Sequence, residues 1–224
     1  MIAIISDVHG NYPALCSVLE EIDKAGCKTI ISLGDVAGYY CMVNECIDEF
    51  RRRNIINILG NHDSYLLGYG RCPRSTTVNR CIDYQKKIIT EENLNYLKNS
   101  VSIYDFDNIS LRHGGWNDPI DEYITTFDFD AAKVTGYKVF GSGHSHIQFL
   151  QEKNGLIYFN PGSVGQPRDN NPLSAYTIID DIGNVKLYRI KYDIDSIAVA
   201  MQQAGFEARN YNCLYVGSKI GGNN

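Results

Sequence analysis

The sequence predicts an α/β fold that begins with a parallel sheet, and three observations support this class. Short apolar runs alternate with segments of helical periodicity in the order strand, helix, strand, helix, strand. The apolar runs are continuous, which is typical of strands buried on both faces. Each strand is followed by a helix, so successive strands are expected to run parallel with right-handed crossovers.

The first strand is expected at Ile2–Ile5, and a helix follows it. Asn11 can accept hydrogen bonds from the free N–H groups at the start of this helix, and Pro13 suits its first turn. Gly26 ends the helix. The apolar face repeats with helical spacing and consists of Leu15, Val18, Leu19, Ile22 and Ala25.

The next two strands are expected at Thr29–Leu33 and Ile55–Leu59. The helix between them is predicted to start with Asn44 as its cap and to end at Arg53. These elements complete the β-α-β-α-β order on which the fold class depends.

Residues 64–100 interrupt this alternation. Tyr65–Arg74 is rich in Gly, Tyr and Arg and predicts a loop, whereas Val78–Ile89 and Glu91–Lys98 have helical periodicity. We expect the whole segment to form a rim or cap that limits the size of a bound molecule.

The second half is rich in short strands separated by turn signals such as Asn154-Gly155 and Gly183-Asn184. A late helix is expected at Ile194–Gln203, followed by a weakly structured tail over 205–224 whose tip frays. No composition shift divides the chain, so 1–224 is expected to be one domain. The candidate strands are Val101–Phe106, Ile109–Arg112, Lys138–Phe140, Ile147–Gln151, Leu156–Phe159, Ala175–Ile179 and Val185–Ile190.

Composition excludes several classes of function. The 224 residues carry a net charge of −5, which argues against general binding to nucleic acid or to an anionic membrane surface. No apolar stretch approaches the length of a membrane span. The seven cysteines include no CxxC pair and no secretory signal is visible, so free thiols and a cytoplasmic location are expected.

The five histidines form the most informative pattern in the chain. Each follows a predicted strand beside Gly, Asp or Asn, and a Gly-Asp dipeptide follows the second strand in the same way. The segments are Asp7-Val8-His9-Gly10, Gly34-Asp35, Gly60-Asn61-His62-Asp63, His113-Gly114 and Gly143-His144-Ser145-His146. Because open α/β sheets place ligand sites at the carboxyl ends of their strands, these side chains are expected to meet.

The donor types indicate a transition-metal site. Imidazoles, two carboxylates and one amide oxygen suit Mn, Fe, Ni, Co or Zn better than Ca or Mg. In extended backbone, residues two apart point the same way, so Asp7 with His9, and His144 with His146, can each chelate one centre.

Each segment alone also has an ordinary structural explanation. Gly34-Asp35 is a common turn, a single histidine often makes one hydrogen bond, and Asn61 or Asp63 can cap a helix. The recurrence of all five segments in order is what indicates a metal site.

In this order, the five segments resemble the sequence blocks of the calcineurin-like metallophosphoesterase superfamily, over residues 6–146. Asn160–Arg168, and Gly34–Tyr39 followed by Asn44-Glu45, are similar to its small single-domain phosphodiesterases from bacteria and archaea. The resemblance implies a four-layer α-β-β-α sandwich of two mixed sheets flanked by helices.

The resemblance also implies two divalent transition-metal ions, with Mn as the first expectation. Asp35 would bridge them, and His62 would face the substrate. The first ion would be held by Asp7, His9, Asp35 and His146, and the second by Asp35, Asn61, His113 and His144. Because Asn61 is neutral, two ions against two carboxylates and one hydroxide leave a net positive charge that attracts phosphate.

The expected activity is therefore hydrolysis of a small phosphodiester or phosphomonoester by a hydroxide held between the metals. His62 would protonate the leaving group, and Asp63 would either orient His62 or cap a helix. Arg168 and Arg112 are the first candidates for binding phosphate oxygens, with Arg71 and Arg74 behind them.

Two other functions stay open. One is hydrolysis of a phosphoanhydride, as in dinucleoside polyphosphates, and the other is a metal-binding scaffold without turnover. A phosphoprotein substrate is less expected, because Gly34-Asp35 lacks the Asp-Arg-Gly that follows in the Ser/Thr phosphatase branch of the family.

Overall fold

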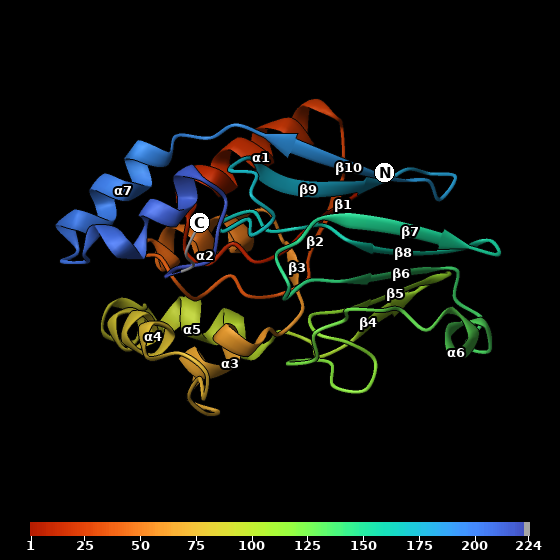
Figure 1. Cartoon of the computed structure of the whole chain (residues 1–224), viewed down its shortest axis with the longest axis horizontal. Helices are drawn as coiled ribbons and strands as arrows, with labels where there is room; N and C mark the ends of the chain where they lie inside the picture. The colour runs from red at the N-terminus through yellow and green to blue at the C-terminus, as the bar shows by residue number, and fades with distance from the viewer. Residues whose placement is uncertain (222–224) are drawn as a thin grey trace.

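A computed structural model, which describes residues 1–221, contains two five-stranded sheets (Figure 1). The first sheet has the order β10-β9-β1-β2-β3 and comprises β1 (Ile2–Ile5), β2 (Thr29–Ser32), β3 (Ile56–Asn57), β9 (Ser174–Ile179) and β10 (Val185–Ile190). The second has the order β4-β5-β6-β8-β7 and comprises β4 (Tyr104–Phe106), β5 (Ile109–Arg112), β6 (Val139–Ser142), β7 (Phe149–Lys153) and β8 (Leu156–Asn160).

Both sheets are mixed, as the family resemblance implies. In the first sheet β1, β2 and β3 are parallel, and β9 and β10 pair antiparallel on one side. In the second sheet β5, β6 and β8 are parallel, and β4 and β7 form antiparallel edges. Each sheet therefore has a parallel centre whose carboxyl ends can present ligands.

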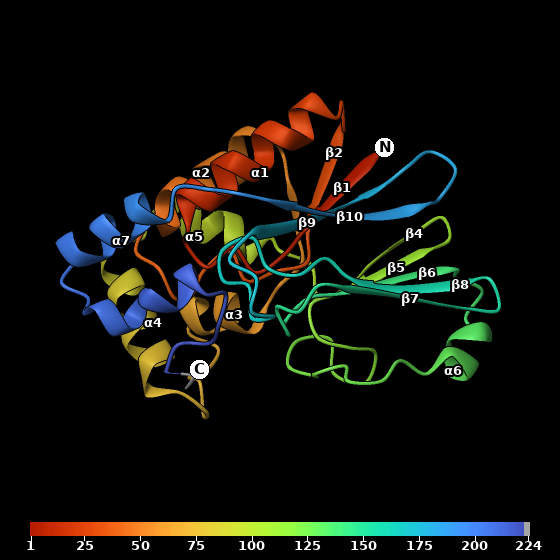
Figure 2. The same ribbon diagram turned by 45° about the horizontal axis from the view of Figure 1, so that its top comes forward.

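Helices complete the layers (Figure 2). The outer side of the first sheet is covered by α1 (Tyr12–Lys24) and α2 (Val43–Arg52), with α7 (Ile194–Gln203) packed on α1. A short helix, α6 (Phe129–Lys133), lies over the outer face of the second sheet. The order helix, sheet, sheet, helix is the predicted four-layer sandwich.

A further helical group, formed by α3 (Asn61–Leu67), α4 (Thr76–Ile88) and α5 (Glu91–Lys98), lies beside the ends of the sheets. It contains both helices that the sequence predicts between residues 64 and 100. The sequence does not predict α3 from periodicity, although Asn61 or Asp63 can cap a helix. Its last three residues are helical where the sequence predicts a loop from Tyr65.

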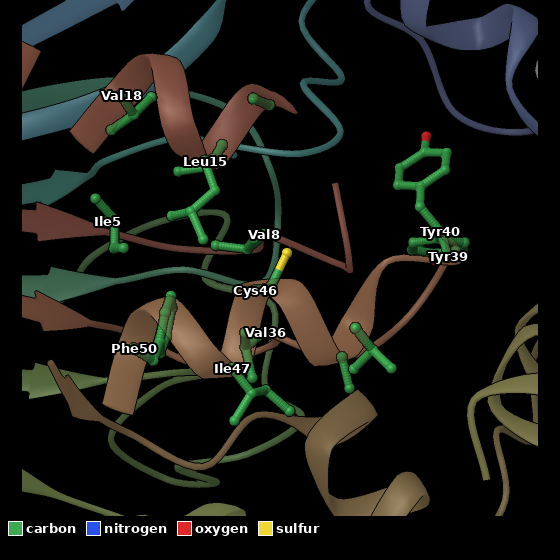
Figure 3. Close-up of a cluster of buried hydrophobic side chains, with 14 of the residues drawn as sticks. Ile5, Val8, Leu15, Val18, Val36, Tyr39, Tyr40, Cys46, Ile47 and Phe50 are labelled. Atoms are coloured by element: carbon green, nitrogen blue, oxygen red, sulfur yellow. The ribbon is translucent and has the colours of Figure 1, made fainter. Parts of the chain in front are cut away.

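Three hydrophobic clusters hold the layers together. Between the sheets lie side chains such as Ile4, Leu33 and Leu111. Leu15 and Phe50 belong to a larger cluster between the first sheet and its helices (Figure 3). A smaller aromatic cluster, Phe127, Phe140 and Tyr158, packs α6 on the second sheet. Each fully buried side chain of this size contributes about 1.5–3 kcal/mol.

Several local predictions differ from the structure, and two strands are shorter than expected: β3 is only Ile56–Asn57 and β4 only Tyr104–Phe106. Met42, not Asn44, is the cap of α2, and Asn44 lies in the first turn, where its side chain donates to the Ile88 carbonyl at 2.8 Å. Asn44 therefore ties α2 to the end of α4. The helix α6 is absent from the prediction because its five residues are too few to show periodicity. The strand expected at Ile147–Gln151 begins two residues later, at Phe149.

The segment after Gly205 is more regular than its weak periodicity suggests. It forms two short 3-10 helices, η1 (Ala208–Asn210) and η2 (Asn212–Tyr215). Cys213 and Leu214 are buried in the core cluster next to the first sheet. The chain tip at 222–224, where fraying is expected, lies outside the described residues.

All seven cysteines are free thiols in this structure. Among the helices of residues 1–221, none combines the length and the apolar character needed to cross a bilayer.

Candidate metal centre

The predicted ligands lie just after β1, β2, β3, β5 and β6, in loops except for Asn61, which begins α3. Five of them have left-handed backbone conformations, which are uncommon for residues other than glycine. Their φ angles are 55° for Asp7, 54° for His9, 57° for Asp35, 64° for His144 and 61° for His146. Strained backbone of this kind concentrates at functional sites. The assumption that the two ligand pairs lie on extended backbone is therefore wrong.

The first group of donors comprises Asp7, His9 and His146, which are fully buried and have ligand atoms within 4.8 Å of one another. The Nε2 atoms of the two histidines are 3.0 Å apart, and His146 Nε2 is 3.3 Å from Asp7 Oδ1. The pair Asp7 and His9 thus shares one centre, as expected from the sequence.

The tautomers of these two histidines make the group a strong candidate for a cation site. His9 Nδ1 donates to the Ala37 carbonyl at 2.8 Å, and His146 Nδ1 donates to the Gln166 carbonyl at 2.6 Å. When both rings are neutral, their Nε2 atoms face each other with lone pairs across 3.0 Å. A cation between them relieves that repulsion, and a backbone carbonyl on the far nitrogen is the usual support of a metal-binding imidazole.

The second group comprises Asp35, His113 and His144, with Asn61 beside them. His113 Nδ1 donates to the Leu33 carbonyl at 2.7 Å, which leaves Nε2 at 3.1 Å from Asn61 Oδ1 and 3.4 Å from Asp35 Oδ2. His144 and His146 therefore belong to different groups. The sequence argument that this pair chelates one centre is wrong, because the turn after β6 sends the two rings apart.

Asp35 lies between the two groups. Its Oδ2 is 3.4 Å from His113 Nε2 in the second group and 3.9 Å from His9 Nε2 in the first. Its other oxygen accepts a hydrogen bond from the His62 backbone N–H at 2.8 Å, which fixes the carboxylate in place. This is the position that a bridging ligand requires.

The donor set fits divalent ions. Asp7 Oδ1, Asp35 Oδ2 and His144 Nε2 are buried and have no hydrogen-bond partner in residues 1–221. An unpaired buried carboxylate oxygen is costly, so these atoms need a ligand that is not a protein group. Mixed nitrogen and oxygen donors match Mn, Fe, Ni, Co or Zn.

The electrostatics of the buried donors point the same way. Burial by itself raises the pKa of Asp7 and Asp35, but the surrounding histidines outweigh it and lower both below the usual range. Burial lowers the pKa of His113, yet Asp35 and Asp7 raise it to about 9. The two carboxylates therefore favour positive charge beside them.

His62 differs from the other histidines. Its Nε2 is 4.0 Å from Asp35 Oδ2, and its Nδ1 has no hydrogen-bond partner in the described chain. Burial lowers the pKa of His62 to about 4. Its ligand atom also lies within 4.8 Å of those of His9 and Asp35, so distance alone does not separate a ligand from a substrate-facing group.

Gly38 allows this crowding. Its φ is +144°, and a Cβ there would clash with His9 Nδ1 and approach His62 Nδ1 to 2.9 Å. Only glycine permits the loop after β2 to pass this close to two imidazole rings.

The structure corrects the orienting role considered for Asp63. Its Oδ2 accepts from the Asp35 backbone N–H at 3.0 Å and its Oδ1 from Ala37 at 2.9 Å. It also accepts from Gly60 at the start of α3. Within the described chain no hydrogen bond joins it to the His62 ring. Asp63 therefore anchors the loop that carries Asp35 and caps α3, which is the second reading of the sequence.

Arg112 is the other correction. Its guanidinium forms a two-point ion pair with Asp105 at 2.6 and 3.1 Å and lies over Trp116. Successive residues of a strand face opposite sides of the sheet, so Arg112 points outward where His113 points into the site. Arg112 is not placed to bind phosphate.

Arg168, in contrast, lies at the site. It donates to Gln166 Oε1 at 2.6 Å and to the Tyr39 hydroxyl at 2.9 Å, and it lies 5.3 Å from the centre of the Tyr39 ring. No carboxylate of the described chain pairs with it. The remaining candidates are paired with carboxylates, Arg71 with Asp83 at the surface and Arg74 with Asp121 beside the site.

A cavity of about 370 Å³ opens over the two donor groups. Its walls come from the metal loops, from the segment between α3 and α4 and from the end of the chain. The lining residues are Asp35, Tyr39, Asn61, His62, Cys72, Arg74, Ser75, Thr77, Val78, Tyr123, His144, His146, Arg168, Lys219 and Ile220.

Sequence reasoning missed several of these neighbours. Asp121 Oδ1 is 3.5 Å from His144 Nε2, and the Tyr123 ring lies 4.0 Å from the His144 ring. Both belong to an irregular loop without a recognisable pattern. Ser6, which donates to Asp7 Oδ2 at 2.6 Å, was detectable as the polar residue that ends the first strand.

Comparison with known proteins identifies the family. The model of the calcineurin-like phosphoesterase superfamily domain matches residues 1–181, so the chain belongs to this superfamily. It is a phosphoesterase, and the family depends on metal ions for its activity.

Three similar proteins cover most of the chain. Protein MJ0912 of Methanocaldococcus jannaschii is 36% identical over 217 residues, with 87% of this chain and 88% of that protein covered. Phosphodiesterase YfcE of Escherichia coli is 26% identical over 195 residues, with 80% and 88% covered. A metallophosphoesterase from Sphaerobacter thermophilus has a TM-score of 0.83 at 28% identity, with 96% and 98% covered.

Proposed function

We propose that this phosphoesterase hydrolyses small phosphodiesters with two divalent transition-metal ions, Mn being the first choice. The observation that carries the proposal is the facing pair of Nε2 atoms on His9 and His146, whose Nδ1 atoms both donate to backbone carbonyls, beside a carboxylate that reaches the second donor group. Similarity to phosphodiesterase YfcE supports a diester rather than a monoester.

Each ion has its own ligand set. Asp7, His9 and His146 would hold the first, while Asn61, His113 and His144 would hold the second, with Asp35 shared. When bound, the ions supply a water nucleophile at neutral pH and neutralise charge on the phosphate.

The protein groups around the cavity have separate tasks. Arg168, whose charge no carboxylate of the described chain balances, would bind non-bridging phosphate oxygens. His62 would hold a proton for the departing oxygen. A phosphate anion in the cavity raises the pKa of an adjacent imidazole, so His62 gains its proton together with the substrate. The walls of the cavity restrict the substrate to a small ester.

His62→Asn tests the proposal. We expect the variant to keep both metal ions and to lose about 10²–10⁴-fold in turnover of diesters with an alkyl leaving group. The loss of turnover on bis(4-nitrophenyl) phosphate should be much smaller, because nitrophenolate leaves without a proton. Metal content by mass spectrometry and turnover on both esters are the measurements, with the exposed Asp83→Asn as the control.

Two results contradict parts of the proposal. If metal content falls together with turnover, His62 is a ligand and not a proton donor. If the wild-type chain splits a dinucleoside polyphosphate into two nucleotides faster than it hydrolyses any ester, the substrate is an anhydride. Absence of turnover on all of these with both ions bound favours a scaffold.

A further inference from the structure

The end of the chain forms part of the wall of the cavity. Lys219 and Ile220 line it together with His62 and Arg168. These two residues lie beyond the part of the chain that matches the family model, which ends at residue 181. The segment 206–221, here named the tail, therefore lies outside the part of the chain that the family model describes.

The tail is anchored to the same network that holds Arg168. Cys213 is buried, with its Sγ 3.8 Å from the Tyr40 hydroxyl. That hydroxyl accepts a hydrogen bond from Gln166 Nε2 at 3.0 Å, and Gln166 Oε1 accepts from the Arg168 guanidinium. The position of the tail is thus coupled to the cation expected to bind the reacting phosphate.

A close backbone contact fixes the tail beside this loop. The Asn170 N–H donates to the Gly217 carbonyl at 3.0 Å. Gly217 has a φ of +66°, and a Cβ there would clash with the backbone of Asn171. Only glycine allows this approach, and it directs the next residues, up to Lys219 and Ile220, toward the cavity.

Charge distinguishes the three cations of the cavity wall. Arg74 is neutralised by its ion pair with Asp121. Arg168 contacts only neutral groups, Gln166 and the Tyr39 hydroxyl. Lys219 makes no ion pair with any carboxylate of residues 1–221. Among the described residues, the cavity therefore offers two cations without an ion pair, although the whole chain carries a net charge of −5.

A phosphodiester has one negative charge at its phosphorus, which the metal ions and Arg168 bind under the proposed function. We propose that Lys219 is a specificity-determining residue that binds a second anionic group, a carboxylate or a phosphate, on the alcohol part of the substrate. The preferred substrates are then acidic phosphodiesters, and the tail provides the subsite. This inference rests on the proposed phosphodiesterase function.

Three esters with the same leaving group test it: 4-nitrophenyl 2-carboxyethyl phosphate, bis(4-nitrophenyl) phosphate and 4-nitrophenyl phosphorylcholine. We expect the wild-type chain to have its lowest KM for the carboxyethyl ester. Lys219→Ala should raise that KM about tenfold, the effect of one lost charged contact, and leave kcat within about twofold. Lys219→Arg should retain the preference, and Lys219→Glu should move it toward the choline ester.

Matched controls separate the subsite from general effects. Lys191→Ala removes a lysine that does not line the cavity and should change no KM. Gly217→Ala should displace the tail and reproduce the Lys219→Ala result. Gly221→Ala has a similar φ of +73° and no neighbour within 4 Å among the described atoms, so it should behave as the wild type.

Equilibrium binding gives a readout that does not need turnover. Calorimetry with monomethyl 2-carboxyethylphosphonate and monomethyl propylphosphonate should show about tenfold tighter binding of the carboxylate compound, and Lys219→Ala should abolish that difference. If the difference persists in the variant, or is absent from the wild type, the inference is wrong. Lys219 also borders a second hollow that is lined by other residues of the tail. If the Lys219 side chain points into that hollow, the two phosphonates should bind equally well and the inference is wrong.

The two proposals fail differently. Hydrolysis of all three esters without any dependence on Lys219 overturns the subsite and leaves the phosphodiesterase function intact. Selective binding of the carboxylate phosphonate without hydrolysis of any ester overturns the phosphodiesterase function and retains the anion subsite.

Discussion

The two sheets supply different chemistry to one site. The loops after β1, β2 and β3 of the first sheet provide both carboxylates, Asp7 and Asp35, together with His9 and the amide of Asn61. The loops after β5 and β6 of the second sheet provide only imidazoles, those of His113, His144 and His146. Negative charge thus comes from one sheet and imidazole nitrogen from the other, so cations bound between them would connect the sheets at this end.

The opposite end of the sandwich lacks such a connection in the described structure. A hollow of about 380 Å³ lies there, lined by Ile2 and Ile179 of the first sheet and by Phe106 and Ile109 of the second. Elsewhere the sheets are joined by the apolar cluster around Ile4, Leu33 and Leu111. Gln148, which precedes β7, also donates to the carbonyls of Tyr176 and Tyr188 in the first sheet. The comparison teaches that the candidate ligands would also connect the sheets once they share a cation.

Asp35→Asn should have the largest effect, because its carboxylate is the ligand from the first sheet that reaches both donor groups. We expect both ions to be lost and turnover to fall about a thousandfold or more, equivalent to about 4 kcal/mol. Metal content and turnover are measured together. His113→Asn, a change in the second sheet, should release only the second ion. If Asp35→Asn also releases only one, Asp35 is not a bridge.

Removal of the ions should have an intermediate effect on stability. Ions present at a hundredfold excess over their dissociation constant stabilise the fold by about 2.7 kcal/mol. For a chain of this size each kcal/mol corresponds to about 2–4 °C, so a chelator should lower Tm by about 5–10 °C.

Calorimetry with a chelator, then with added Mn²⁺, checks this expectation. Hydrogen exchange should accelerate mainly at 34–37 and 143–147, the loops that carry ligands from the two sheets. Equal acceleration at the hollow end would show that the ions do not act as a local connection between the sheets.

Arg112→Lys should have the smallest effect. The change removes the two-point contact with Asp105 and the contact with Trp116, which lie on the outer face of the second sheet. We expect a loss of about 1 kcal/mol in the free energy of unfolding and no change in KM. Arg168→Lys, at the cavity, should raise KM instead. A higher KM in Arg112→Lys would instead support the sequence prediction that Arg112 binds phosphate.

The location of the site was predictable because each ligand directly follows an apolar run. A buried strand such as Ile2–Ile5 is recognisable from composition, and the residues after it, Asp7 and His9, must lie at the sheet edge. The assignment of His144 and His146 to separate ions was available only from the family resemblance. Periodicity cannot reveal it, because left-handed turns replace the extended backbone there.

The remaining errors share one physical cause, which is that neighbours in the sequence need not touch. Asp63 follows His62 but bonds to the loop of Asp35, and Arg112 precedes His113 but faces the other side of its strand. Conversely, Asp121 and Lys219 reach the site from irregular segments without a local signal. Such contacts are set by tertiary packing alone.

The placement of the tail has a practical consequence for handling the protein. An affinity tag fused after Asn224 would begin six residues beyond Lys219, which lines the cavity. The amino group of Met1 pairs with Asp181 at the far end of the sandwich, where a tag is remote from the ligands (Figure 1). Purification handles therefore belong at the amino terminus when substrate profiles are compared.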